Sequence, residues 1–93
     1  MTATITRKTI LVSKDMHVDT VVRLLTTQLN NFSYAIIKAR GQQIIKALDG
    51  VEILKNKIFY KKIKRIDIKT STETIEHDNK KLDITTIKIV LDM

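Results

Sequence analysis

The sequence predicts an α+β two-layer sandwich, a mixed four-stranded sheet with two helices on one face, in the order β-α-β-α-β-β. Two segments with apolar residues at helical spacing each follow a short apolar run, and the C-terminal third changes to the two-residue alternation of strands. A chain of 93 residues supports one hydrophobic core. We therefore expect a single domain over residues 1–93, with residues 1–7 flexible.

The first half of the chain predicts a strand-helix-strand unit. Residues 8–13, "KTILVS", suit a short buried strand, and residues 16–30 carry the apolar stripe of an amphipathic helix. "NNFS" is then predicted as a turn. Residues 34–39, "YAIIKA", predict a second strand covered on both faces, because polar alternation is missing. A unit of this length normally closes as a right-handed parallel crossover.

A second helix is predicted from about residue 42 to 58, with apolar side chains again at helical spacing. Its length would be roughly 25 Å at 1.5 Å per residue. Gly50 lies inside it and costs of order 1 kcal/mol relative to alanine. This glycine either lets another helix approach closely or is a tolerated substitution, and the sequence leaves both interpretations open.

Two half-exposed strands complete the predicted sheet. Alternating isoleucines and leucines mark "KIKRIDIKT", residues 62–70, and "ITTIKIVLD", residues 84–92. The polar stretch between them, residues 71–83, is predicted as a long hairpin connection with "DN" at its tip.

Composition narrows the classes of function. The formal net charge of +7 favours polyanionic partners, nucleic acid first and an acidic membrane face or acidic protein second. Cysteine is missing, which excludes a disulfide framework, a thiolate metal site and a cysteine nucleophile. No apolar run approaches the roughly 18 residues that span a bilayer. His17 and His77 have no clustered ligands, and no catalytic triad or phosphate-cradling glycine loop is present, so we expect no metal, cofactor or enzymatic activity.

The segment "IIKARGQQIIKALDGVEILKNK", residues 36–57, resembles the central segment of the Alba family of small basic archaeal chromatin proteins. "ILVSKD" and "TTIKIVLD" are similar to further family segments, so the resemblance extends from about residue 8 to 92. It implies a two-layer α+β fold, a two-fold homodimer, and binding of double-stranded DNA and RNA with little dependence on sequence. No small-molecule substrate or membrane is implied.

The resemblance leaves two alternatives for biological role. Archaeal members coat chromosomes, whereas eukaryotic relatives bind RNA, including as subunits of ribonuclease P and MRP. The chain is therefore expected to be a cytoplasmic, chromosome-associated protein, or a nuclear or cytoplasmic RNA binder that pairs with a paralogue as a heterodimer. A small enzyme with an anion pocket is a further alternative, which the missing acid-base set disfavours.

Lys38 and Arg40 lie two residues apart at a strand end, so both side chains are expected on one face of the sheet. Gly41 then turns the chain into a helix start, whose free N–H groups beside two cations suit a phosphate. The alternatives are that these charges only solvate the strand end, or that they pair with Asp49 or Glu52. The resemblance favours phosphate contact and adds Lys46, on the same helix, to the predicted nucleic-acid contacts.

The resemblance also assigns Lys14 to a loop that contacts DNA and that some members acetylate. At the next position the family often has lysine, but here Asp15 follows. In the family the long hairpin is a flexible arm that reaches the minor groove, which implies contacts by Lys80 and Lys81, with Lys69 at the base. Three acidic residues in the same hairpin oppose this role: Glu73, Glu76 and Asp78.

Seven of the 15 residues from 55 to 69 are basic, either as a solvated strand face or as a patch that steers a polyanion. The end of the second helix lies near dimer and dimer-dimer contacts in the family. We accordingly predict that Leu54, Ile58 and Phe59 pack between protomers and do not contact nucleic acid.

Overall fold

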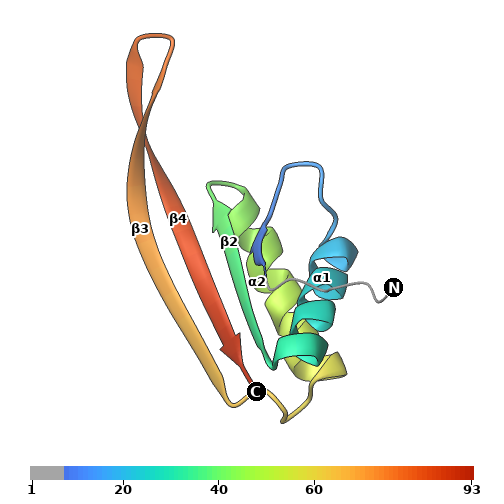
Figure 1. Ribbon diagram of the computed structural model, residues 1–93. Coiled ribbons are helices and arrows are strands. Elements are labelled where there is room, and N and C mark those ends of the chain that lie inside the picture. Colours follow the sequence, from blue (N-terminus) through green and yellow to red (C-terminus); the bar gives the residue numbers. More distant parts are fainter. Residues whose placement is uncertain (1–7) are drawn as a thin grey trace, which may run out of the picture.

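The computed structural model describes residues 8–93, so the predicted flexible stretch over 1–7 lies outside the described residues. These described residues form four strands, two α-helices and one π-helical turn (Figure 1): β1 (Thr9–Leu11), α1 (Val18–Phe32), β2 (Tyr34–Arg40), α2 (Gln43–Ile53), η1 (Leu54–Ile58), β3 (Arg65–His77) and β4 (Lys80–Asp92).

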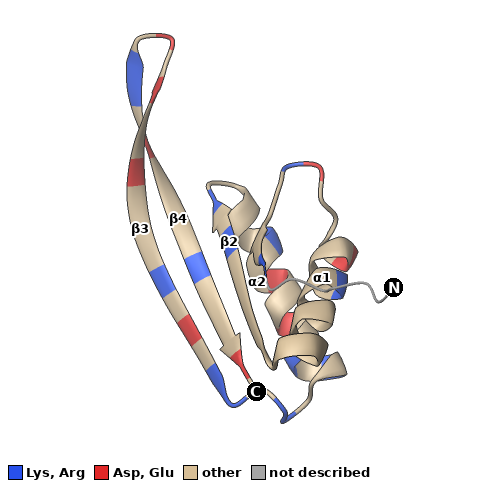
Figure 2. Ribbon diagram, in the orientation of Figure 1, with Lys and Arg blue, Asp and Glu red and all other residues tan. Residues whose placement is uncertain are grey.

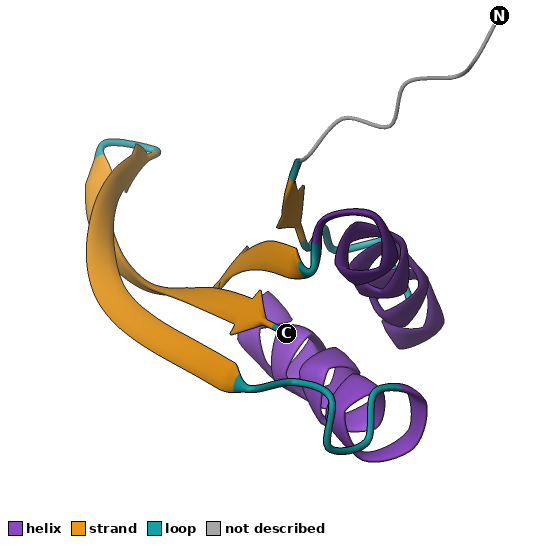
Figure 3. Ribbon diagram, turned by 60° about the horizontal axis from the view of Figure 1, so that its bottom comes forward, coloured by secondary structure: helices purple, strands orange, loops and turns teal. Residues whose placement is uncertain are grey.

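The sheet order is β1-β2-β4-β3, with β1 parallel to β2 and the other neighbours antiparallel. Both helices lie on one side of this mixed sheet, which leaves its other face open (Figure 3). The predicted fold class and element order are confirmed.

The core lies between the helices and the inner face of the sheet. Strand β4 shows how the alternation builds it, since Ile87, Ile89 and Leu91 are buried and the residue between the first two, Lys88, is exposed. Burial of apolar surface at about 25 cal/mol per Å² is the main stabilising contribution to such a fold. The largest side chains with essentially no exposed surface are Val21, Leu25, Leu29, Ile37, Leu54, Ile89 and Leu91.

Two boundaries in the first half differ from the prediction. The predicted "NNFS" turn is wrong, because α1 continues to Phe32 and ends at Ser33 in the left-handed region, with φ 55°. The Ser33 N–H donates to the Leu29 carbonyl at 2.9 Å, and the Asn31 amide donates to the Thr27 carbonyl at 2.7 Å. Polar side chains that favour turns are thus accommodated on the exposed surface of the helix. Strand β1 is also shorter than predicted.

The second helical segment has the predicted extent, but its last turn is wider than an α-helix. The Phe59 N–H donates to the carbonyl of Leu54, five residues earlier, at 2.8 Å. Of the two interpretations of Gly50, close approach is the one that the structure supports. A Cβ atom there would lie 2.7 Å from Cγ1 of Val21, so the missing side chain at residue 50 lets α1 and α2 pack this closely.

The predicted long connection over 71–83 is wrong, although "DN" is indeed at the tip. Strands β3 and β4 pair without interruption from Arg65↔Asp92 to His77↔Lys80. Asp78 and Asn79, with φ 51° and 62°, form the two-residue turn, which matches the handedness of a tight hairpin. The outer part, Ser71–Thr86, projects beyond the rest of the molecule (Figure 1) and is called the arm below; all other described residues are the body. Because no second layer covers the arm, its sequence lacks the apolar alternation that reveals a strand.

Candidate nucleic-acid interface

The loop between β1 and α1 and the turn between β2 and α2 form one end of the body, which we call the loop end. Lys14 is in the loop, and Arg40 is the last residue of β2. Gly41 has φ 58°, and its N–H donates to the Thr85 carbonyl at 2.8 Å. Glycine is needed there for backbone conformation and not for space, since an added Cβ would meet its nearest neighbour at an ordinary 3.7 Å. The side chain of Gln42, the N-cap residue of α2, makes no capping hydrogen bond, which leaves backbone N–H groups available to an anion.

Lys46, in the first turn of α2, ties the loop between β1 and α1 to that helix. Its ammonium group donates to the carbonyl oxygens of Ser13 at 3.2 Å and Lys14 at 3.1 Å. The predicted nucleic-acid contact at Lys46 is thus brought beside Lys14, but its charge is already occupied in holding the loop. Helix α2 in this way fixes the position from which Lys14 reaches solvent.

Arg40 has an ion-pair partner, but not one of those considered from the sequence. Its guanidinium lies 3.3 Å from a carboxylate oxygen of Glu73, at the base of the arm, rather than against Asp49 or Glu52. Both side chains are more than half exposed. An exposed pair of this kind contributes little stability, so a phosphate can replace the carboxylate at low cost.

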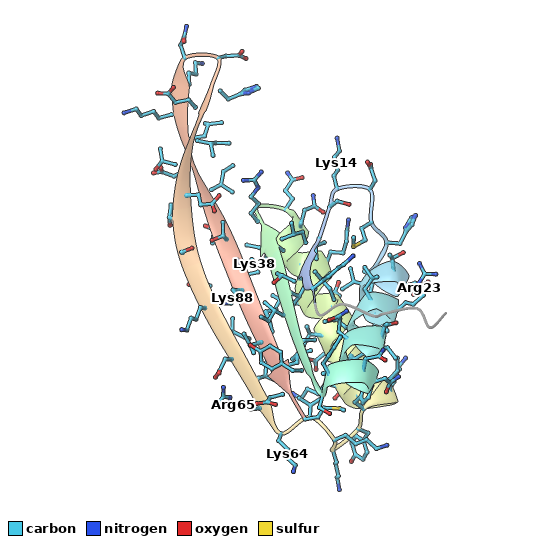
Figure 4. The ribbon with its side chains drawn as sticks, in the orientation of Figure 1. Lys14, Arg23, Lys38, Lys64, Arg65 and Lys88 are labelled. Carbon is cyan, nitrogen blue, oxygen red and sulfur yellow. The ribbon has the colours of Figure 1, made fainter. Side chains whose placement is uncertain are left out.

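The open face of the sheet brings together lysines from three strands. Lys38 of β2 lies directly opposite Lys88 of β4, which lies directly opposite Lys69 of β3. Figure 4 shows Lys38 and Lys88 side by side, and Figure 2 shows adjacent basic positions on β3 and β4. Lys38 and Arg40 share this face, as their spacing predicts. The sheet curves here around a groove of about 730 Å³, to which Lys38, Arg40, Lys69 and Lys88 all contribute.

Sequence reasoning missed Lys88 as a functional candidate. The alternation in "TTIKIVLD" places Lys88 on the face opposite Ile87 and Ile89, which is a signal that it lies on the open face. Its neighbours, however, follow only from the β2–β4–β3 order and register. That register depends on the two-residue turn at the tip, where the sequence predicts a longer connection.

The arm differs from the rest in charge. Lys80 and Lys81 are at its outer end, as predicted, but the arm carries Asp83 in addition to Glu73, Glu76 and Asp78. Two lysines against four carboxylates give the arm a formal charge of −2. The remaining residues of the chain therefore carry +9, and the two values sum to the net charge of +7. Acidic positions at the tip are visible in Figure 2. Of the four carboxylates, Glu73 is near the body, where it faces Arg40.

The residues predicted to pack between protomers occupy two environments. Leu54 and Phe59 are buried in the core of the single chain, whereas Ile58 is 45% exposed. Ile58 is therefore the one of the three that presents a large apolar surface.

The basic segment 55–69 does not form a single strand face, because it spans η1, a loop and the start of β3. Within it, Arg65 pairs with Asp67 at 3.1 Å, and the Lys61 ammonium lies 5.3 Å from the centre of the Tyr60 ring.

Within residues 8–93, no three side chains of the metal-ligating types His, Cys, Asp and Glu gather at a point where they could hold an ion. No helix of this part of the chain is long and apolar enough to cross a membrane.

Comparisons with known proteins agree on one family. The sequence model of the Alba family matches residues 8–75. A protein named DNA/RNA-binding protein Alba from Methanoculleus marisnigri is 41% identical over 71 residues, which are 75% of this chain and 77% of that one. A protein of the same name from Thermoplasma acidophilum is 37% identical over 82 residues, 88% of this chain and 91% of that one. The solved structure of Alba from Thermoplasma volcanium superposes with a TM-score of 0.81 at 33% identity, over 92% of this chain and 100% of that one.

Proposed function

Because this chain belongs to the Alba family, we propose that it is a non-enzymatic, dimeric chromatin protein that binds double-stranded DNA and RNA through their phosphates. The observation that carries this proposal is the loop end, where Lys14 lies in a loop that Lys46 ties to α2 and Arg40 ends the strand that leads into the same helix. The relatives' names support both kinds of nucleic acid as partners. Association with the chromosome follows from the same proposal.

The cations of the body favour binding that is tolerant of sequence. Lysine and arginine side chains that contact phosphates release condensed counterions, and this release is the same whatever the bases. Phosphate contacts position a protein on nucleic acid but carry no sequence information directly. Because the arm has a formal charge of −2, we assign the main phosphate contacts to the body and only a minor one to Lys80 and Lys81.

Dimerisation is supported by an apolar surface on the inner face of β3. Ile68 lies directly opposite the fully buried Ile89, yet it is 52% exposed, since the principal helix contacts of the sheet are with β1 and β2. Leu48 of α2 and Ile58 of η1 are further exposed apolar side chains. A second copy of the chain, or a paralogue, would cover such a surface. A homodimer would carry +14, twice the +7 of one chain.

The RNA-directed role is the second candidate, because the names of the relatives include RNA as well as DNA. Competition between duplex DNA and structured RNA for the pure protein, together with crosslinking and sequencing of native complexes, separates the two roles. Acetylation of Lys14 stays a prediction in either case; it would remove one cation from the loop end.

The test of the phosphate contacts is Lys38→Ala and Arg40→Ala, each compared with Lys57→Ala, which removes the same charge from an exposed position of η1. We expect the first two variants to bind duplexes of unrelated sequence with uniformly weaker affinity. The slope of log affinity against log salt should become shallower by about one unit per lost contact. Affinity that does not depend on salt, or no binding to duplex DNA or RNA at low salt, would contradict the proposed function.

A further inference from the structure

The three lysines on the open face of the sheet form a row without an intervening residue. Lys38, Lys88 and Lys69 are direct cross-strand neighbours in the β2–β4–β3 register. Neighbouring strands lie about 4.8 Å apart, so the row spans roughly 10 Å. Like charges directly opposite each other destabilise a sheet, which means that the free protein retains a repulsive arrangement on this face.

No ion pair within the described residues 8–93 includes a lysine of this row. Within residues 8–93, none of the three ammonium groups takes part in an ion pair or a hydrogen bond. Two carboxylates of β3 share the face, but each already has an arginine partner: Asp67 lies 3.1 Å from Arg65, and Glu73 lies 3.3 Å from Arg40. An external anion is consequently the group that would offset the repulsion.

The surroundings of the row fit a sugar-phosphate chain better than a bare inorganic anion. The row lines the groove of about 730 Å³, which is open enough for part of an extended polymer. Leu11, on β1, lies directly opposite Lys38 and is 66% exposed, so an apolar side chain continues the row at its β1 end. Sugars and base edges offer apolar surface to such a residue, whereas phosphate ions and inorganic polyphosphate do not.

We propose that the open face of the sheet is a second phosphate-binding surface, where Lys38, Lys88 and Lys69 contact consecutive phosphates of one nucleic-acid strand and Leu11 packs against its sugars or bases. This inference rests on the proposed function and adds to it a contact surface apart from Lys14 and the start of α2. Lys88, at the centre of the row, is its defining residue, because both of its strand neighbours at this level are lysines.

The experiment measures binding by the full-length protein of a random-sequence DNA duplex and of a single-stranded DNA of the same length. Lys88→Gln is compared with Lys57→Gln, which makes the same change in net charge on η1, and with Lys88→Arg, which keeps the charge. One lost phosphate contact changes the salt slope by about 0.9 for a duplex and about 0.7 for a single strand. At 0.1 M salt we expect Lys88→Gln to bind roughly 5- to 10-fold more weakly than Lys57→Gln, and Lys88→Arg to bind like the unchanged protein.

Thermal unfolding of the free protein supplies a second readout. If the row is repulsive, Lys88→Gln should raise Tm by about 1–3 °C while it weakens binding, because one substitution removes two like-charge neighbours. A purely structural role for Lys88 would instead lower Tm and affinity together.

The outcomes separate this inference from the proposed function. If the unchanged protein binds nucleic acid but Lys88→Gln and Lys57→Gln have equal affinities and salt slopes, the second surface is wrong and the proposed function stands. If the unchanged protein binds neither nucleic acid, both are wrong. A defect of Lys88→Gln with the duplex alone, or with the single strand alone, supports the surface and identifies which form of strand it takes.

Discussion

The body and the arm of this protein use the same β3–β4 ladder in opposite ways. In the body, β4 directs Ile87, Ile89 and Leu91 into a core closed by two helices, and its opposite face carries Lys88. In the arm the ladder continues to His77↔Lys80, and no helix of residues 8–93 covers either side of it (Figure 1). The body carries a formal excess of positive charge, while the arm carries −2.

The difference indicates that stability and phosphate binding both belong to the body. Burial of apolar surface stabilises a fold, and the arm buries little of it, because its apolar residues are at most half-buried. With four carboxylates on it, this arm is also less attracted to a polyanion than the surface from which it projects.

Leucine truncation in each region gives the largest expected contrast. Leu25→Ala in α1 removes a fully buried side chain and should lower the free energy of unfolding by about 2–5 kcal/mol. Leu82→Ala in the arm, where the side chain is 45% exposed, should lower it by less than about 1 kcal/mol. Urea unfolding of both variants tests this. Equal losses would mean that the arm contributes to the cooperative unit as much as the core does.

Gly50→Ala probes the helix layer that the arm lacks. The added methyl group would meet Cγ1 of Val21 at 2.7 Å, and overpacking of this kind costs roughly 1–3 kcal/mol. Alanine returns about 1 kcal/mol through its helix propensity, so we expect a net loss of about 0–2 kcal/mol in urea unfolding. Asp49→Ala, at the exposed preceding position, is the control and should change stability little. A stability of Gly50→Ala above that of the unchanged protein would show that the helices can separate at no cost.

The fold of the body could be predicted from the sequence, because burial there imposes a periodic pattern of apolar residues. Apolar spacing marks both helices, and alternation marks the inner face of β4, so fold class and element order could be predicted. The outer arm could not, since a strand with two exposed faces needs no alternation. The end of α1 at Asn31 and Phe32 was also not predicted. Asparagine favours turns in general, but here the helix accommodates it at its exposed surface.

The residues of the candidate site also differ in whether the sequence alone could place them. Lys38 and Arg40 could be placed on one face from a two-residue spacing within a single strand. Lys88 could not be placed beside Lys38 and Lys69, because those neighbours depend on the pairing of three strands. The partners of Arg40 and Lys46 were also beyond prediction, since Glu73 and the loop carbonyls come close only after the chain has folded.

The most direct test of the central claim, that the body carries the phosphate contacts, is to shorten the arm. Replacing residues 74–83 with Asn-Gly closes the hairpin just beyond the Glu73↔Ile84 pair and removes Lys80 and Lys81 together with three carboxylates. We expect the shortened protein to bind duplex DNA at 0.1 M salt within about threefold of the full chain, with an unchanged salt slope. A slope shallower by about two units, with a loss of affinity of more than about 10-fold, would assign two phosphate contacts to the arm and contradict the claim.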